Sequence, residues 1–141
     1  MILEASIFCL AMNIYHESRN QPLAGQLAVG FSTLNRVAAP NYPNDICGVV
    51  LQARYKKHSA FPILNRCQYS WFCDGKSDEP TDDKAMLEAT MLAKHIIQGS
   101  AGIDFTDGAT HYHATWIDPP TWASPEYMTE IVTIGDHTFY R

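Results

Sequence analysis

The sequence lacks a long apolar run, a paired-cysteine motif and a glycine-rich loop, and each absence excludes a class of protein. No stretch of roughly 18 uncharged apolar residues occurs, which excludes a transmembrane helix. Because C-x-x-C is absent, neither a zinc knuckle nor a thioredoxin-like site is expected. The chain also has no phosphate-binding glycine loop and no G-x-S-x-G motif, so it carries no signature of a nucleotide enzyme or a serine hydrolase.

Positive charge is scarce as well. Ten Lys and Arg residues stand against 15 Asp and Glu residues, which gives a formal net charge of −5. Proteins that hold nucleic acid through its phosphates need the opposite balance, so no nucleic-acid partner is expected. The apolar residues 1–12 have no Lys or Arg ahead of them, and a secretory signal peptide is therefore not predicted. We expect synthesis in the cytoplasm without a leader and no insertion into a membrane.

What is present favours one α+β domain, mostly helical, over residues 1–141. The hydrophobic content of 46% is sufficient for a core in a chain of this length. Apolar residues recur at helical spacing in three long segments, and turn-rich stretches separate them. The predicted elements are helices over 2–19 and 22–37, a short helix over 46–54, a loop over 55–66, a strand over 67–72, a helix capped by Thr81 and ended by Gly99, and a small β-hairpin over 130–134 and 137–140.

Four cysteines leave the disulfide pattern open. Cys9 lies within the first apolar helix and is expected to pack there as a small hydrophobic side chain. Any pair among Cys47, Cys67 and Cys73 can form a bridge in an oxidising compartment, and the sequence does not choose between the pairs.

Glu17 is the main candidate for chemistry because it continues the apolar stripe of the first helix by one step. The stripe consists of Leu3, Ile7, Leu10 and Ile14. A carboxyl group on that face is directed toward the protein, where burial raises its pKa. A carboxylic acid that stays protonated near neutral pH is what a glycosidic oxygen needs as a proton donor. The alternative is an ordinary helix-end Glu in an ion pair with Arg19 or Arg36.

His111 and His113 raise a different possibility. Alternate residues of a strand point the same way, so both rings can reach one metal ion. A third ligand at the usual spacing is missing, and Asn20 stands where a two-histidine protease helix starting at His16 would need its second histidine. We therefore assign no metal and no cofactor, and keep a zinc-dependent endopeptidase or amidase as the alternative.

Aromatic side chains alternate with polar ones in two segments, a composition that suits sugar rings, which have an apolar face and a polar edge. The alternative is core packing. The predicted substrate-binding residues are Gln68, Tyr69, Ser70, Trp71, His111, Tyr112, His113 and Trp122.

These residues belong to blocks that together span most of the chain in a fixed order. The blocks are residues 11–19, 25–30, 34–37, 42–50 with Gln52, 67–71, 108–113 with Pro120 and Trp122, and 134–140. With them the chain resembles the cell-wall hydrolase family typified by the catalytic domain of the spore-cortex-lytic enzyme SleB. Residues 54–64 do not align with the family pattern, and we expect this insertion to shape substrate access.

The resemblance implies a lysozyme-like fold and cleavage of the glycan strands of peptidoglycan. It implies lytic transglycosylase action at the β-1,4 bond between N-acetylmuramic acid and N-acetylglucosamine, with Glu17 at the position of the family's catalytic glutamate. No second carboxylate has a strong claim; Asp74, Asp107 and Asp118 all lie in predicted loops. We expect Tyr112 or Ser70 to hold the acetamido oxygen of the substrate.

A lone catalytic domain without a leader is typical of a phage endolysin that reaches the wall with the help of a holin-like protein. We therefore expect a monomer that acts on the bacterial cell wall. A glycan-binding module without catalysis is the third alternative.

Overall fold

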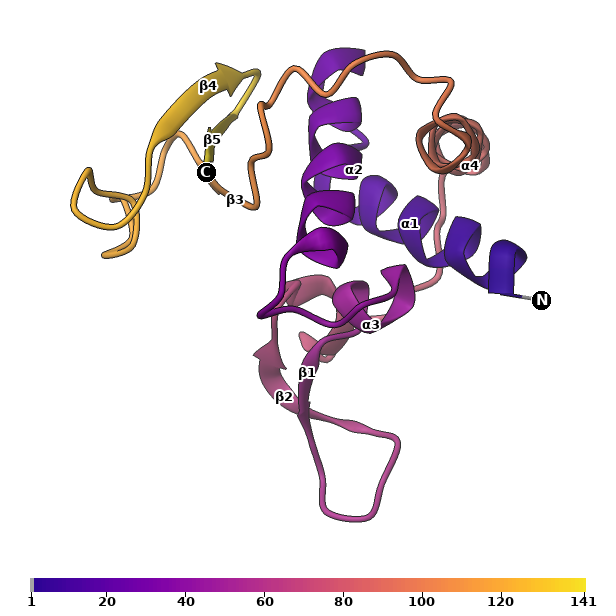
Figure 1. Ribbon diagram of the computed structural model, residues 1–141. Coiled ribbons are helices and arrows are strands. Elements are labelled where there is room, and N and C mark those ends of the chain that lie inside the picture. Colours follow the sequence, from indigo (N-terminus) through magenta and orange to yellow (C-terminus); the bar gives the residue numbers. More distant parts are fainter. Residues whose placement is uncertain (1) are drawn as a thin grey trace.

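Three long helices and two small sheets make up the fold, and a computed structural model describes residues 2–141 (Figure 1). In chain order the elements are α1 (Ile2–Ser18), α2 (Leu23–Ala38), α3 (Ile46–Val50), β1 (Ala53–Tyr55), β2 (Pro62–Cys67), the 3-10 helix η1 (Ser70–Cys73), α4 (Asp83–Gln98), β3 (His111–Ala114), β4 (Glu130–Ile134) and β5 (His137–Tyr140). Helix α1 packs against α2 and α4, and the C-terminal sheet lies beside α2 on the side away from α4 (Figure 1). The predicted α+β, mostly helical class is confirmed.

The core forms where α1 crosses α2 and α4. Leu10 and Ile14 are fully buried there, whereas Leu3, at the start of the same stripe, is 53% exposed. Only the second half of the α1 stripe therefore faces the protein, and this is the half that leads to Glu17. The helix ends before Pro22 because the residue preceding a proline disfavours helical angles.

A three-stranded sheet completes the fold. Strands β3 and β4 both pair antiparallel with β5, in the order β3-β5-β4. The predicted hairpin of residues 130–134 and 137–140 is confirmed as β4 and β5. Phe139 of β5 is fully buried against Ala28 and Val29 of α2, so α2 carries the core on one side and the sheet on the other.

Residues 53–67 form a β-hairpin where a loop was predicted over 55–66. Ala53 pairs with Cys67 and Tyr55 with Pro62. The short helix α3 ends at Val50 rather than at residue 54, and the predicted strand over 67–72 is wrong because Ser70–Cys73 is a 3-10 helix. Tyr69 and Trp71 are buried in one core cluster, and Phe72 packs against it.

The N-cap of helix α4 is Asp82 rather than the predicted Thr81. The Asp82 carboxylate accepts a hydrogen bond from the Ala85 amide at 3.0 Å, which makes Asp82 the N-cap. The backbone amides of Thr81 and Asp82 both donate to the Tyr15 hydroxyl at 3.1 Å, so Thr81 is held by α1 instead. The helix ends at Gly99, as predicted, with a φ of 77°.

Two disulfides are present, Cys9–Cys47 and Cys67–Cys73. The prediction that Cys9 is an unpaired apolar side chain is wrong, because Cys9 lies on the side of α1 that packs against α3, where Cys47 is located. Cys67–Cys73 is one of the pairs that the sequence left open. The Cys9–Cys47 bond joins residues 38 apart, and a loop of that length corresponds to about 3–4 kcal/mol in the chain-entropy treatment.

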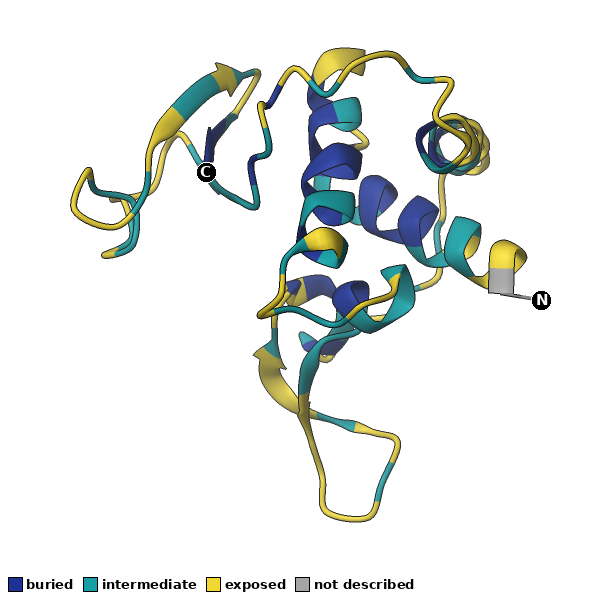
Figure 2. Cartoon of the chain, in the orientation of Figure 1, coloured by how far each residue is buried: buried dark blue, intermediate teal, exposed yellow. Residues whose placement is uncertain are grey.

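Burial follows this arrangement (Figure 2). Buried residues gather where the helices meet and where the sheet faces α2, whereas the hairpin β1–β2 is mostly exposed. Among residues 2–141 we find no helix with the length and apolar character needed to cross a membrane.

The β4–β5 turn docks on the α1–α2 connection through a reciprocal pair of hydrogen bonds. The Gln21 amide donates to the Asp136 carboxylate at 3.0 Å, and the Asp136 backbone amide donates to Gln21 Oε1 at 2.9 Å. Gly135 lies at the contact with a φ of 57°, and a Cβ there would collide with Gln21 Oε1. Glycine is therefore favoured by the backbone angle, and a Cβ would displace the Gln21 side chain from its hydrogen bonds.

We expect Gly135→Ala to lower the free energy of unfolding by about 2–4 kcal/mol, from left-handed strain and two weakened hydrogen bonds. Urea denaturation measures this loss. Gly102→Ala is the matched control, because Gly102 has a φ of 90° and no atom within 4 Å of its Cβ position. The control loses only about 1–2 kcal/mol of backbone strain. Equal losses in the two variants would contradict the docking contact.

Candidate functional site

Glu17 lies in the last turn of α1 and faces β3. The Tyr112 hydroxyl donates a very short hydrogen bond to Glu17 Oε1. Glu17 is only partly exposed, and burial raises the pKa of its carboxyl, while the bond from Tyr112 and the charge of Arg36 act in the opposite direction. The direction agrees with the sequence-based expectation of a desolvated acid.

The alternative of an ordinary ion pair does not describe this carboxyl. Among residues 2–141, Glu17 takes part in no ion pair. Arg19 instead lies over the Tyr15 ring, with its guanidinium carbon 4.8 Å from the ring centre. Arg36 is close enough to influence the Glu17 pKa but bonds elsewhere. Glu17 is therefore a desolvated acid held by a tyrosine rather than a neutralised surface charge.

Arg36 is buried beside the site. Its Nε donates to the Thr110 carbonyl at 2.6 Å, and its guanidinium carbon lies 5.1 Å and 5.3 Å from the ring centres of Tyr42 and Tyr69. Within the described chain, its Nη1 and the Tyr69 hydroxyl are buried without a hydrogen-bond partner of ordinary geometry. Buried polar atoms without partners are uncommon in native structures, and both of these belong to groups that interact electrostatically with Glu17.

Helix α2 also fixes the segment that carries Tyr112. The Asn35 amide donates to the Asp104 carboxylate at 2.8 Å and to the Ala109 carbonyl at 2.9 Å. Asp104 in turn accepts from the amide and the hydroxyl of Thr106. Adjacent residues of α2, Asn35 and Arg36, thus hold the chain just before β3, and Tyr112 follows two residues later.

Trp71 is tied to α1 by a buried polar chain. Its indole donates to Asn13 Oδ1 at 2.9 Å, and Asn13 donates to Thr33 of α2 at 3.2 Å. The His16 ring stacks on Trp71 with centroids 4.6 Å apart, and its Nε2 donates to the Asp78 carbonyl at 2.7 Å. Trp71 therefore positions η1, and His16 covers one of its faces.

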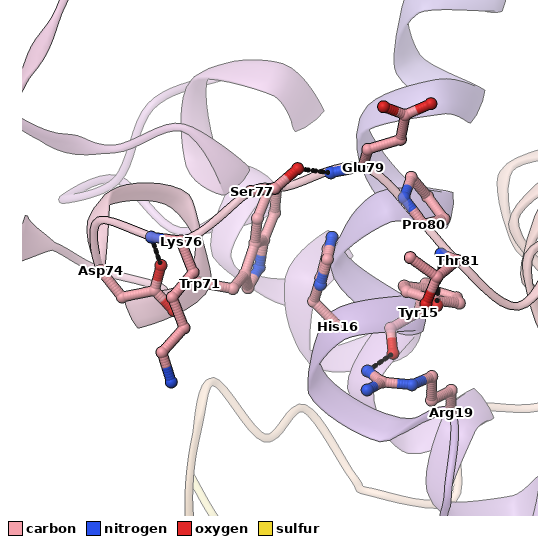
Figure 3. A pocket seen from close by; sticks show the side chains of 10 residues that line it. All are labelled: Tyr15, His16, Arg19, Trp71, Asp74, Lys76, Ser77, Glu79, Pro80 and Thr81. Carbon is pink, nitrogen blue, oxygen red and sulfur yellow. Dashed lines mark hydrogen bonds between the residues drawn. The ribbon is translucent and has the colours of Figure 1, made fainter.

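A pocket of about 420 Å³ opens beside the last turns of α1 (Figure 3). Tyr15, His16 and Arg19 line it from the helix, Trp71 lines it from η1, and the loop of residues 74–81 closes it. Glu17 is not among the residues that line this pocket; its carboxyl is directed to Tyr112 of β3.

The structure brings only some of the predicted substrate-binding residues to Glu17. Tyr112 touches the carboxyl, and the Tyr69 ring lies nearby over Arg36, but Tyr69 and Trp71 are buried core residues. Gln68 and Ser70 are exposed on either side of Tyr69. The expectation that Tyr112 or Ser70 holds the substrate's acetamido oxygen stays a prediction; in this structure the Tyr112 hydroxyl donates its hydrogen to Glu17.

His111, His113 and Trp122 lie on the other face of β3 from Tyr112, since neighbouring strand residues point to opposite sides. Both histidine rings contact Trp122, with centroids 4.9 Å and 5.9 Å apart. His113 Nδ1 donates to the Ala114 carbonyl, which leaves Nε2 to accept from the Tyr140 hydroxyl at 2.9 Å. Neither nitrogen of His113 is then free to bind a metal ion.

The ring of His111 is engaged at both nitrogens as well, by Thr110 and Tyr42. Across residues 2–141 we find no group of three or more His, Cys, Asp or Glu side chains placed to hold a metal ion. The side chains of the described residues therefore give no support to the alternative of a zinc-dependent endopeptidase or amidase.

Sequence reasoning missed the positioning roles of Asn13, Asn35 and Arg36. Asn13 carried a signal, because a fully buried amide inside an apolar helix needs partners. The contacts of Asn35 and Arg36 are with residues more than 60 positions away, and no local pattern marks such partners.

Comparison with known proteins gives a consistent result. Residues 20–140 match the sequence profile of the cell wall hydrolase family. The spore cortex-lytic enzyme of Bacillus cereus is 31% identical over 137 residues, which are 94% of this chain and 42% of that enzyme. The enzyme of the same name from Halalkalibacterium halodurans is 26% identical over 136 residues, 92% of this chain and 33% of that enzyme. The chain thus spans less than half the length of these curated relatives.

Solved structures match over nearly the whole chain. The catalytic domain of the SleB protein of Bacillus cereus superposes with a TM-score of 0.66 at 26% identity, covering 98% of this chain and 91% of that domain. The catalytic domain of the germination-specific lytic transglycosylase SleB of Bacillus anthracis gives a TM-score of 0.70 at 26% identity, covering 96% of this chain and 93% of that one. These matches confirm the predicted lysozyme-like fold. With the fold, the site geometry and the profile match in agreement, the chain belongs to the cell wall hydrolase family.

Proposed function

We propose that this protein cleaves the glycan strands of peptidoglycan as a lytic transglycosylase, with Glu17 as its general acid and base. One observation supports this most strongly: a desolvated carboxyl with a raised pKa, at the end of a core helix and hydrogen-bonded to the Tyr112 hydroxyl. The similarity to spore cortex-lytic enzymes and to SleB catalytic domains supports the substrate class. Because the family profile begins at residue 20, the role of Glu17 rests on its geometry.

In the proposed reaction, protonated Glu17 gives its proton to the oxygen that joins N-acetylmuramic acid to N-acetylglucosamine. The bond from this oxygen to C1 of the muramic acid breaks, and positive charge develops on the sugar ring. The C6 hydroxyl of the same ring then attacks C1 and forms the 1,6-anhydro bond. The Glu17 carboxylate takes the proton of that hydroxyl, which restores the starting state of the enzyme.

Two residues would tune this proton exchange without touching the substrate. The hydrogen bond from Tyr112 and the charge of Arg36 both favour the carboxylate, which is the form left after proton donation. Burial favours the acid, which is the form needed first. Influences in both directions suit a group that acts first as acid and then as base.

Substrate contacts are proposed for the exposed polar residues on either side of Tyr69 and for the pocket that Trp71 lines. Gln68 and Ser70 flank the buried Tyr69, and either can reach a sugar that lies against η1. Since Tyr112 is engaged with Glu17, Ser70 is the better candidate for the acetamido group. His111, His113 and Trp122 are proposed to contact the glycan further along β3.

The proposed place of action is the bacterial cell wall. Both disulfides suit an oxidising environment outside the cytoplasm. Three points stay predictions: that residues 1–141 act as one catalytic domain, that the protein is a monomer, and that it is an endolysin assisted by a holin-like protein.

We expect Glu17→Gln to lower the rate of cell-wall clearing at least about a hundredfold, because Gln keeps the shape of Glu but cannot donate a proton. Turbidity of purified sacculi measures the rate. Mass spectra of wild-type products should contain 1,6-anhydro ends, whereas reducing ends would indicate plain hydrolysis.

Two controls accompany this experiment. Exposed Glu88 of α4 is distant in sequence from the site, and Glu88→Gln should keep wild-type activity. Clearing by the wild type should also be insensitive to EDTA. Full activity of Glu17→Gln would remove the assignment, and loss of wild-type activity in EDTA would restore the zinc alternative.

The same substitution should stabilise the fold at neutral pH. A carboxyl whose pKa is higher in the folded than in the unfolded state contributes stability below its unfolded pKa and loses it as pH rises through the folded pKa. Each pKa unit corresponds to about 1.4 kcal/mol. Glu17→Gln should therefore melt above the wild type at pH 7, with a gap that shrinks toward pH 4. A constant gap in melting temperature across this range would contradict the raised pKa.

Tyr112→Phe should shift the pH profile upward. Removing a hydrogen bond to the carboxylate raises the pKa of Glu17 further, so the alkaline limb of kcat/KM moves to higher pH. The maximal rate falls as well, because the carboxyl loses its fixed orientation. Tyr127→Phe, at an exposed tyrosine, is the control and should leave the profile in place. An unshifted alkaline limb in Tyr112→Phe would show that Tyr112 does not tune Glu17.

A further inference from the structure

The hairpin β1–β2 differs in charge from the rest of the chain. Although the chain has a net charge of −5, the sequence contains no Asp or Glu from Leu51 to Cys73. Four of the ten Lys and Arg residues lie within the hairpin, residues 53–67. They are Arg54, Lys56, Lys57 and Arg66, and all four are exposed. Among residues 2–141, none of these four forms an ion pair.

Large apolar side chains are exposed on the same hairpin. Phe61 is 72% exposed and Leu64 is 60% exposed, and Ile63 and Tyr55 are exposed to a lesser extent. The hairpin projects from the body of the molecule, below α3 in Figures 1 and 2, and its strands and tip are exposed over most of their length. Cations and apolar groups therefore share one protruding surface.

This surface has a defined shape. The Lys56 amide donates to the Phe61 carbonyl at 3.0 Å, and the Ser59 amide donates to the Lys56 carbonyl at 3.0 Å, which closes the tip on itself. At the base, a pocket of about 390 Å³ is lined by Pro62, Leu64 and Phe72, with Lys56 and Lys76 contributing its only charges. A pocket with two ammonium groups and apolar walls is suited to a molecule that carries an anionic head group on an apolar chain.

We propose that the hairpin β1–β2 docks on a membrane surface rich in anionic phospholipids. Each Lys or Arg close to such a surface contributes to binding, and apolar side chains such as Phe61 enter the boundary between headgroups and acyl chains. A soluble or wall-bound polyanion would need the cations but would leave Phe61 and Leu64 in water. The exposed apolar side chains therefore favour a lipid surface over a polyanion.

One covalent bond connects the hairpin to a neighbouring segment of the fold. The Cys67–Cys73 disulfide ties the end of β2 to η1, which also carries Trp71. The docking surface is thus covalently tied to the segment that carries Trp71. The docking does not depend on Glu17 and is tested without substrate.

Vesicle flotation tests the proposal with the whole chain. We expect binding to phosphatidylethanolamine vesicles that contain phosphatidylglycerol and none to phosphatidylcholine vesicles. Lys56→Gln/Lys57→Gln should weaken binding about tenfold or more, since each cation contributes roughly fivefold. Lys84→Gln/Lys94→Gln is the matched control, because it removes the same charge from exposed positions on α4 and should bind like the wild type.

A second pair of variants separates the lipid from a polyanion. Phe61→Ser should weaken binding to the anionic vesicles about fivefold or more, whereas Ile103→Ser, at a residue 89% exposed elsewhere, should not. Circular dichroism verifies that each variant is folded. Three results would each overturn the proposal: no binding of the wild type to anionic vesicles, equal losses in the two lysine variants, or Phe61→Ser binding like the wild type, which would indicate a polyanion partner.

Discussion

The contact between Tyr112 and Glu17 is the constraint around which the two halves of this fold are arranged. Glu17 ends the buried half of α1, and Tyr112 lies on a strand almost one hundred residues later. Neither residue could hold its place alone. Helix α2 fixes both sides, since it packs on α1 through the core and holds the chain before β3 through Asn35 and Arg36. The partly desolvated carboxyl of Glu17 is thus enclosed by elements from both ends of the chain.

The surroundings of Glu17 shift the pKa of its carboxyl in opposite directions. Desolvation favours the acid, while a hydrogen bond and a nearby guanidinium favour the carboxylate. A fully apolar pocket would raise the pKa of Glu17 until the carboxylate could no longer form, and an ion pair would lower it until the acid was not populated. The buried Arg36, which bonds to a carbonyl rather than to Glu17, provides an intermediate influence through space.

Features set by local pattern could be predicted from the sequence, and features set by distant partners could not. Helical spacing placed α1, α2 and α4 and identified Glu17 as the residue that continues a buried stripe. The hairpin β1–β2 was missed because its burial pattern does not alternate, and most of its residues are exposed. Cys9 was assigned to the core because its helix is apolar, although its partner Cys47 lies 38 residues away. The roles of Tyr112 and Arg36 depend on contacts across the fold, which no spacing encodes.

Part of the free-energy cost in this structure lies where the chemistry is proposed. The cluster around Glu17 holds a desolvated acid and a buried Arg36 nitrogen that has no hydrogen-bond partner among the described residues, and an unpaired buried nitrogen costs about 1–3 kcal/mol. Elsewhere the fold has fully buried apolar side chains and two disulfides that oppose this cost. Selection for stability alone would remove the cluster, since a glutamine at position 17 would remove the raised-pKa penalty. A stable scaffold that retains a locally unfavourable acid is the pattern expected when that acid reacts.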